Sequence, residues 1–301
     1  MKVFVIGGSG LVGSHCLTYF REKGWKVEGS HCNYATDRTS YYNTLEPQNK
    51  NNFDVISFRP DVIVHCAALT NVDHCETHEE ESYQHTFKST EHVCELSMIC
   101  GARMVYISTD YVFNGDHGPY NENDIPNPIN IYGKHKLLSE QVVINSIIDS
   151  LVIRVTNVYG DESRAKNFVA RIIKQCQDNK EPFCLKLPYD QFATPINAYD
   201  IARAMFCLIS DKKKGIYHLS STDYMNRVEL AKKILSYLNN DQFINVEPVD
   251  SSTLKQIAKR PLLAGLLKVK FTNEYPTFVF NSVDNYLASI RKYSFSEWKH
   301  P

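Results

Sequence analysis

The sequence lacks any run of about 18 consecutive apolar residues, the length that a membrane-spanning helix needs. It also has little net charge, because 33 Lys and Arg residues stand against 34 Asp and Glu residues, giving a formal net charge of −1. Binding to nucleic acid or to an anionic membrane calls for clustered Lys and Arg. We therefore expect neither partner and take a small molecule as the ligand class.

Paired cysteine spacing and a long apolar leader are also missing. The nine cysteines are an odd number scattered along the chain, and Met1 leads directly into the strand-like residues 2–6. This pattern predicts reduced thiols and a cytoplasmic protein. Cys75 and His78 form a C-x-x-H pattern, but no second ligand pair follows at a zinc-finger spacing, so the sequence predicts no metal site.

Strand-like and helix-like segments alternate along the 301 residues, a length that allows one large α/β domain or a nucleotide domain with a smaller lobe. Apolar runs at residues 61–68 and 104–107 predict buried parallel strands. The alternation continues at residues 151–154, 197–209 and 227–238. We expect an α/β fold with a doubly wound parallel sheet. Residues 1–150 would form a Rossmann-like domain, and residues 151–301 would form mainly a smaller lobe, with some segments returning to the first domain.

A glycine-rich turn joins the first predicted strand to the first predicted helix. Gly7, Gly10 and Gly13 have G-x-x-G-x-x-G spacing, which permits a tight turn, close approach of a pyrophosphate and close packing of the helix on the strand. Small residues also end the run at 61–68. The predicted dinucleotide contacts in these two segments are Gly7, Ser9, Gly10, Leu11, Val12, Gly13, Cys66, Ala67 and Ala68.

The end of the second predicted strand carries no carboxylate, since the sequence there reads Ser30-His31-Cys32. An acidic residue at this position usually binds the ribose 2′-OH of NAD and repels the 2′-phosphate of NADP. With Ser30 as the predicted contact, we expect a preference for NADP(H), with NAD(H) also accepted. Arg38 lies farther along the following loop and is not assigned from the sequence.

Hydroxyl and phenol groups are expected to meet at the carboxyl edge of the sheet. Ser108, Thr109 and Asp110 follow a buried strand, at the edge where open α/β sheets bind ligands. Tyr132 and Lys136 stand four residues apart on a predicted helix and therefore share one face. A phenol is a poor acid or base near neutral pH unless a nearby ammonium favours its phenolate. The combination predicts acid–base chemistry at a polar ligand.

Several motifs occur in the order seen in dTDP-4-dehydrorhamnose reductases, which are extended short-chain dehydrogenases. They lie at residues 7–13, 108–113, 132–136, 190–192 and 260–261. The resemblance covers nearly the whole chain. The sequence is also similar to the regulatory beta subunit of methionine adenosyltransferase, which looks like a descendant of the same scaffold.

This resemblance implies that Tyr132 protonates the C4 oxygen of a nucleotide-linked 4-keto-6-deoxysugar while NAD(P)H delivers hydride to C4. Lys136 would hold the cofactor ribose and lower the pKa of Tyr132, and Thr109 would hydrogen-bond the carbonyl. The implied reaction is that of dTDP-4-dehydrorhamnose reductase, in dTDP-L-rhamnose biosynthesis. The implied sugar contacts are Thr109, Asp110 and Asn157, and the implied nucleotide contacts are Gln191, Phe192 and Arg260, the last suited to the pyrophosphate. A homodimer is left open.

Two departures from the reductase pattern keep other functions open. Thr86 stands where these enzymes usually carry an Asn that organises a proton-relay water, and residues 262–265 are apolar where the reductases are polar. One alternative is a non-catalytic, NADP-binding regulatory subunit. Another is an NAD-dependent epimerase or dehydratase, although a dehydratase needs a carboxylate base where this chain has Tyr111.

Overall fold

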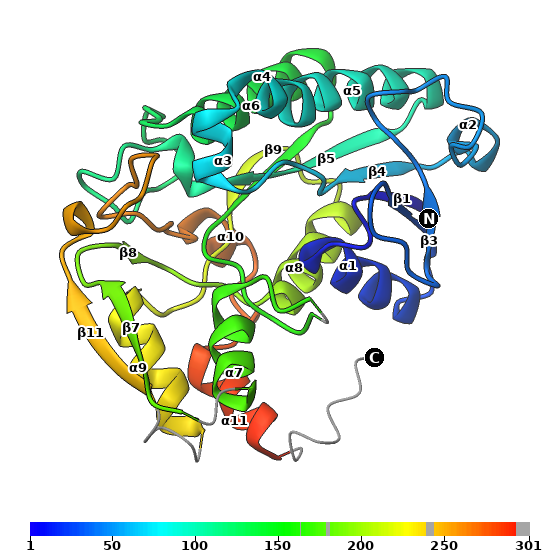
Figure 1. Ribbon diagram of the computed structural model, residues 1–301. Helices are drawn as coiled ribbons and strands as arrows, with labels where there is room; N and C mark the ends of the chain where they lie inside the picture. Colours follow the sequence, from blue (N-terminus) through cyan, green and yellow to red (C-terminus); the bar gives the residue numbers. More distant parts are fainter. Residues whose placement is uncertain (163, 179–180, 239–243, 293–301) are drawn as a thin grey trace.

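A seven-stranded parallel sheet forms the centre of the protein (Figure 1). The computed structural model describes residues 1–162, 164–178, 181–238 and 244–292. The strand order is β3-β2-β1-β4-β5-β6-β9, and every neighbouring pair is parallel. The strands are β1 (Lys2–Ile6), β2 (Lys26–His31), β3 (Thr39–Tyr41), β4 (Val62–His65), β5 (Arg103–Thr109), β6 (Leu151–Val155) and β9 (Gly215–His218). The predicted doubly wound α/β sheet is confirmed.

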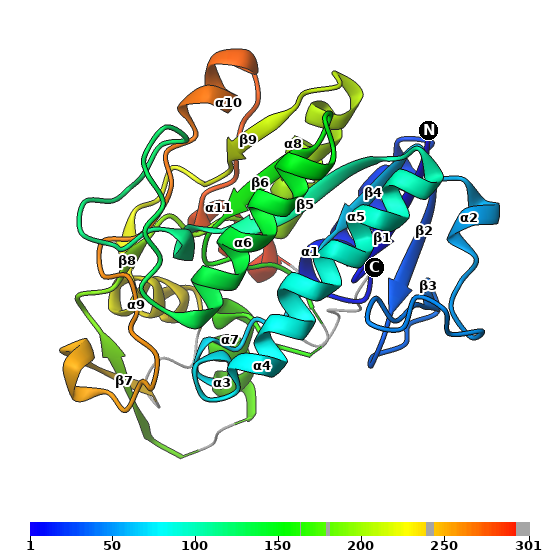
Figure 2. The same cartoon turned by 90° about the horizontal axis from the view of Figure 1, so that it is seen from above.

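Helices cover both faces of this sheet. One face carries α2 (Val55–Phe58), α3 (Val72–Thr77), α4 (Glu79–Ser82), α5 (Ser89–Cys100) and α6 (Ile131–Ser146), and the other carries α1 (Leu11–Glu22) and α8 (Ala198–Ser210). Figure 2 shows α5 and α6 lying side by side across the first face. Because both faces are buried, the strands are continuously apolar, as in β4 with Val62, Ile63 and Val64.

The helical region over residues 79–100 is interrupted. A π-helical segment, η1 (Tyr83–Lys88), separates α4 from α5. Thr86 lies in this segment and is buried, and its carbonyl accepts hydrogen bonds from the hydroxyls of Thr90 at 2.6 Å and Ser139 at 3.3 Å. The π-helical segment therefore offers the Thr86 carbonyl as an acceptor to two neighbouring hydroxyl groups.

A second group of elements lies on the side of the sheet away from α4 to α6 (Figure 1). Its helices are α7 (Phe168–Asp178), α9 (Arg227–Tyr237) and α11 (Val283–Lys292), and its strands form two small sheets, β7 (Phe183–Pro188) with β11 (Ile244–Val249) and β8 (Phe192–Ala193) with β10 (Met225–Asn226). Ile172, Ile234 and Leu287 belong to its separate apolar core. Shorter helical segments are η2 (Asp110–Val112), η4 (Ser251–Thr253) and α10 (Val269–Glu274).

The chain passes back and forth between the two groups. After residue 150, β6 and β9 join the central sheet, and α8 packs on the face of the sheet that also carries α1. In contrast, α7 and α9 belong to the second group. Within the described part of the chain, no helix has both the length and the apolar character required to cross a membrane.

Candidate functional site

The glycine-rich turn between β1 and α1 is closely packed. Gly7 has a φ of +81°, and a Cβ there would lie 2.9 Å from the Ala67 nitrogen. A Cβ at Gly13 would collide with the Gly7 carbonyl, so α1 approaches β1 as closely as it does only because both residues are glycine. The N-cap of α1 is Gly10, which has no side chain to cap the first N–H groups. These N–H groups are left to bind an anion.

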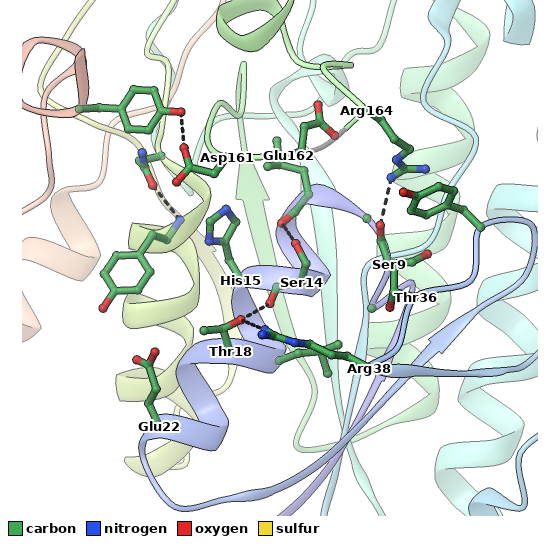
Figure 3. Close-up of a pocket in the computed structure, with 18 of the residues that line it drawn as sticks. Ser9, Ser14, His15, Thr18, Glu22, Thr36, Arg38, Asp161, Glu162 and Arg164 are labelled. Atoms are coloured by element: carbon green, nitrogen blue, oxygen red, sulfur yellow. Dashed lines mark hydrogen bonds between the residues drawn. The ribbon is translucent and has the colours of Figure 1, made fainter. Parts of the chain in front are cut away.

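A cavity of about 660 Å³ lies beside this helix end (Figure 3). Gly8, Ser9, Gly10 and Leu11 contribute to one part of its wall, and Arg38 on the loop after β2 contributes to another. Residues from later parts of the chain also line it, among them Asp161, Glu162, Arg164, Asn197, Tyr199, Asn285 and Tyr286. The size and polar lining suit a nucleotide. The tight turn and the uncapped helix end together fit the diphosphate of a dinucleotide.

Two arginines flank the cavity. Arg38 donates to the Thr18 hydroxyl at 3.1 Å, which holds its guanidinium over α1. Arg164 donates to the Ser9 carbonyl at 3.1 Å and lies 4.6 Å from the centre of the Tyr34 ring. Neither arginine is assigned by a sequence motif, because each lies on a loop without one.

The other predicted cofactor residues lie at different depths around the glycine-rich turn. Ser30 is buried and accepts a hydrogen bond from the Gly7 nitrogen at 3.3 Å, so it supports the turn from below. Val12 packs against the core beneath α1. Cys66 continues the pairing of β4 with β1 by donating its backbone N–H to the Ile6 carbonyl at 2.9 Å, and Ala67 leaves no room for a side chain at Gly7.

Tyr132 and Lys136 lie on the first turns of α6. Asn130 caps this helix by accepting from the Gly133 nitrogen at 2.8 Å. Burial raises the pKa of Tyr132 above its usual range, and a smaller interaction with the Thr109 side chain opposes this shift. Tyr132 is therefore a protonated acid at neutral pH, with the Thr109 hydroxyl beside it.

The Lys136 ammonium lies behind this pair in a buried position. It donates to the Ile107 carbonyl at 2.5 Å and lies 4.0 Å from the centre of the Tyr106 ring. Burial lowers the pKa of Lys136 to about 7, because removing the ammonium from water disfavours its charge. Lys136 thus changes charge near neutral pH.

His65 lies next to this position on β4. Its ring centre is 5.7 Å from that of Tyr106, and neither ring nitrogen has a hydrogen-bond partner among the described residues. Burial, with a smaller contribution from Lys136, lowers the pKa of His65 to about 3. The imidazole is therefore neutral at any physiological pH.

Asp110 is buried directly after β5. Its carboxylate accepts from the Thr156 hydroxyl at 2.6 Å, the Thr109 hydroxyl at 3.2 Å and the Gly265 nitrogen at 3.3 Å. Burial raises its pKa despite these bonds. In this arrangement Asp110 ties together three segments at the edge of the sheet.

Asn157 lies next to an arginine that the sequence did not single out. Its backbone has a φ of +39°, and its side-chain oxygen accepts from Arg227 at 2.6 Å. The Arg227 guanidinium lies 4.8 Å from the centre of the Phe168 ring, and that of Arg171 lies 5.6 Å from the same ring. Arg227 also interacts electrostatically with Tyr111. A second positive region therefore faces the carboxyl edge of the sheet.

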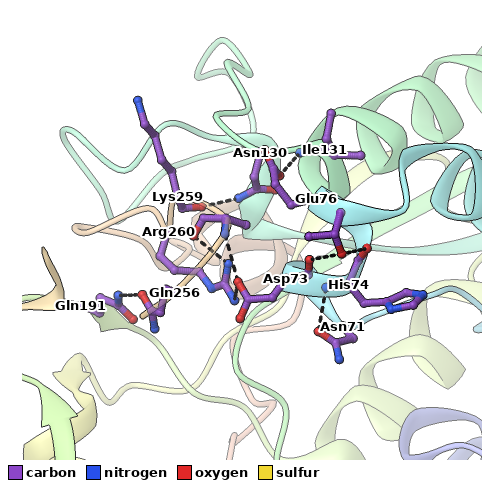
Figure 4. Close-up of polar contacts among 12 residues, drawn as sticks. Asn71, Asp73, His74, Glu76, Asn130, Ile131, Gln191, Gln256, Lys259 and Arg260 are labelled. Atoms are coloured by element: carbon purple, nitrogen blue, oxygen red, sulfur yellow. Dashed lines mark hydrogen bonds and ion pairs between the residues drawn. The ribbon is translucent and has the colours of Figure 1, made fainter. Parts of the chain in front are cut away.

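The three residues expected at the nucleotide half of the substrate are held by other parts of the chain. Arg260 forms an ion pair with Asp73 at 2.9 Å, and Gln191 donates to Gln256 at 2.8 Å (Figure 4). Phe192 stacks on Tyr224, with the ring centres 5.4 Å apart. The segment around Arg260 is thereby fastened to α3.

The cysteine and histidine pattern at residues 75–78 lies in and just after α3. His74 pairs with Glu81 at 2.8 Å, and Asp73 is the partner of Arg260. No group of three or more His, Cys, Asp or Glu side chains suited to a metal ion occurs among the residues described.

Comparison with known proteins gives matches over most of the chain. Residues 1–288 match the model of the RmlD substrate binding domain family. Methionine adenosyltransferase 2 subunit beta of Danio rerio is 31% identical over 273 residues, which cover 88% of this chain and 79% of that protein. Spore coat polysaccharide biosynthesis protein SpsK of Bacillus subtilis (strain 168) is 32% identical over 235 residues, 78% of each chain.

A solved structure extends these matches to the fold. It is the dTDP-4-dehydrorhamnose reductase of Bacillus anthracis str. Ames in complex with NADP, with a TM-score of 0.82, 28% identity, and coverage of 96% of this chain and 97% of that one. Both resemblances inferred from the sequence motifs are therefore confirmed. The chain belongs to the RmlD substrate binding domain family.

Proposed function

We propose that this protein is an NADP(H)-preferring reductase of a nucleotide-linked 4-keto-6-deoxysugar, with dTDP-4-dehydrorhamnose as the substrate. The observation that carries the proposal is the position of Tyr132 beside Thr109, the last residue of β5 at the carboxyl edge of the sheet, with Lys136 one helical turn away. A protonated phenol and a neighbouring hydroxyl can together polarise a ketone oxygen. The family match and the reductase structure support the same reaction class.

The reaction divides between the cofactor and the residues of this chain. When bound, the reduced nicotinamide would supply the hydride for C4 of the sugar. Tyr132 donates its phenolic proton to the C4 oxygen, and Thr109 hydrogen-bonds that oxygen as negative charge develops on it. The Lys136 ammonium stabilises the phenolate that remains, because a positive charge nearby favours the ionised phenol.

The cofactor is proposed to lie across the glycine turn with its diphosphate at the start of α1. Gly7, Gly10 and Gly13 allow this approach, and Arg38 is placed to pair with a 2′-phosphate because it lines the same cavity. This assignment gives NADP(H) a positively charged partner that Ser30, buried under the turn, does not provide. NAD(H) would bind without this contact.

The sugar nucleotide is proposed to bind between the sheet edge and the segments after residue 150, which form most of the C-terminal lobe. Asn157 would contact the hexose, together with Thr109 and Asp110. Arg227, stacked on Phe168, is a better placed diphosphate partner than Arg260, which is already paired with Asp73. Gln191, Phe192 and Arg260 remain candidates for contacts with the nucleobase of the substrate.

The proposal is tested by mixing the purified protein with NADPH and dTDP-4-dehydro-L-rhamnose and following the loss of absorbance of the reduced nicotinamide. We expect turnover, a large fall in kcat for Tyr132→Phe and nearly unchanged NADPH affinity. Tyr19→Phe is the matched control, since Tyr19 lies on α1 and packs against Tyr199 of α8. Undiminished turnover in Tyr132→Phe would refute the assignment of the acid.

A second candidate function is that of a regulatory subunit of methionine adenosyltransferase. It is favoured by the identity to the Danio rerio subunit and by the ion pair of Arg260 with Asp73, which occupies a predicted substrate contact. A stable complex with a methionine adenosyltransferase catalytic subunit in size-exclusion chromatography, together with no turnover of the sugar nucleotide, would select this function over the reductase.

A further inference from the structure

The loop between β6 and α7 leads from the central sheet to the second group of elements and contacts the glycine turn on its way. From this loop, Arg164 donates to the Ser9 carbonyl at 3.1 Å (Figure 3). The Arg164 guanidinium also lies 4.6 Å from the centre of the Tyr34 ring. Ser9 belongs to the glycine turn, and Tyr34 belongs to the loop after β2. Arg164 therefore joins three segments that are far apart in the sequence.

The backbone around Arg164 is held in place by Asn167, the residue before α7. The Asn167 side chain donates to the Gly160 carbonyl at 2.9 Å and accepts from the Ala170 nitrogen at 2.9 Å. The carboxylate of Glu162 accepts from the Asn167 backbone N–H at 2.5 Å. These bonds tie the loop to the start of α7 and position Arg164 before a ligand arrives, which lowers the entropy cost of binding.

Most N–H donors of Arg164 are left for a ligand. A guanidinium has five N–H donors, and the contact with Ser9 uses one of them. Arg38 likewise uses one donor on the Thr18 hydroxyl. Both arginines line the cavity beside α1. Among the described residues neither of them forms an ion pair, in contrast to Arg154, which is paired inside the protein. The cavity therefore contains two positive charges without a carboxylate partner.

Both guanidinium groups are associated with the loop after β2. In a dinucleotide-binding fold, the ribose of the adenosine lies at the end of this strand. Arg38 belongs to this loop, and Arg164 is placed over it by the Tyr34 ring, whose face attracts a cation. A phosphate on the 2′ oxygen of that ribose would thus enter a cavity that both arginines line.

We propose that Arg164 is the second arginine of a 2′-phosphate site, which the protein builds from both groups of elements. Arg38 comes from the central sheet and Arg164 from the loop that leads to α7. Arg164 binds the phosphate with the donors that its contact with Ser9 leaves unused, and such charge-assisted bonds are stronger than bonds between neutral groups. This inference rests on the proposed cofactor site and extends it from one arginine to two.

The test measures the binding of NADPH and NADH to the native protein and to Arg164→Gln by calorimetric titration. We expect NADPH to bind about 10- to 100-fold more weakly to the variant, because a charge-assisted contact is lost, while NADH affinity stays the same. The unchanged NADH affinity also shows that the variant is folded. Lys166→Gln is the matched control, because Lys166 is an exposed cation on the same loop and lies outside the cavity lining.

A double variant tests whether the two arginines share one site. With Arg38→Gln and Arg164→Gln combined, the preference for NADPH over NADH should disappear. Adenosine 2′,5′-bisphosphate and adenosine 5′-monophosphate differ only in the 2′-phosphate. Their affinities should show the same dependence on both arginines without the nicotinamide half of the cofactor.

The proposal is overturned if Arg164→Gln binds NADPH as tightly as the native protein does. It is also overturned if NADPH and NADH lose affinity by the same factor, which would place Arg164 at the diphosphate. Either result leaves the proposed reductase function intact, because Tyr132 and Lys136 are not involved. Conversely, a protein that shows the expected binding but does not turn over the sugar nucleotide would keep the two-arginine site and lose the reductase function. A native protein that binds neither cofactor would refute both.

Discussion

Arg154 and Glu140 form a two-pronged ion pair inside the protein. The Nη2–Oε2 distance is 2.7 Å, the Nε–Oε1 distance is 2.9 Å, and each side chain is 2% exposed. Arg154 is on β6 and Glu140 on α6, one turn beyond Lys136. The pair therefore fixes the rotation of the helix that carries Tyr132 and Lys136.

The first prediction concerns this ion pair. Glu140→Gln leaves the Arg154 guanidinium buried without a counter-charge, so the free energy of unfolding should fall by about 3–5 kcal/mol. The double variant Glu140→Gln/Arg154→Met should recover most of this loss because no buried charge remains. Urea unfolding followed by circular dichroism measures both. A loss in the single variant no larger than in the double variant would contradict the prediction.

The second prediction concerns the pH dependence of turnover. Because the pKa of Lys136 is about 7 and Tyr132 keeps its proton at neutral pH, kcat/KM for the sugar nucleotide should be level below pH 7 and fall as the pH rises through about 7. Lys136→Arg keeps a positive charge at every accessible pH. The overall rate of Lys136→Arg should be lower, but the pH at which its kcat/KM falls should be higher. If kcat/KM of the variant still falls near pH 7, titration of Lys136 is not the cause of the fall.

The third prediction concerns stability in acid. His65 is buried and its pKa is lowered to about 3, so the unfolded chain binds a proton that the folded protein does not between pH 6.5 and 3. His65 makes its full contribution to the free energy of unfolding above pH 6.5. This contribution is lost as the pH falls, by up to about 1.4 kcal/mol per pH unit. Urea unfolding at several pH values should show a shallower slope for His65→Phe than for the native chain.

The fourth prediction concerns cofactor choice. Replacing Arg38 by Gln removes the guanidinium proposed to bind the 2′-phosphate, so NADPH should bind about 10- to 100-fold more weakly while NADH affinity stays the same. Lys23→Gln is a suitable control, because Lys23 follows α1 and lies 5.2 Å from the centre of the Tyr19 ring. Calorimetric titration with each cofactor measures both affinities. Equal losses of affinity for NADPH and NADH would argue against a 2′-phosphate contact.

The parts of the site that the sequence predicted are those encoded locally. The glycine turn and the Tyr132–Lys136 spacing each lie within a few residues, and helical and strand periodicity place them on known elements. The central parallel sheet followed from the same patterns and is confirmed.

The parts that the sequence did not predict depend on contacts between distant segments. Arg227 and Asn157 are 70 positions apart, and neither belongs to a motif that signals the contact. The ion pair of Arg260 with Asp73 likewise requires the folded chain. The π-helical segment at residues 83–88 covers only six residues, which is too short to change the side-chain periodicity of the sequence in a recognisable way.

The return of the chain to its central sheet sets the order in which the protein can be completed during synthesis. Strand β5 is finished at Thr109, but its outer neighbour β6 is not available until Val155 and the last strand not until His218. A nascent chain leaving the ribosome therefore carries an unpaired, apolar strand edge while residues 110–218 are being translated, and such edges promote aggregation. Chaperone dependence and the insolubility of fragments cut near residue 150 are the expected costs of this topology.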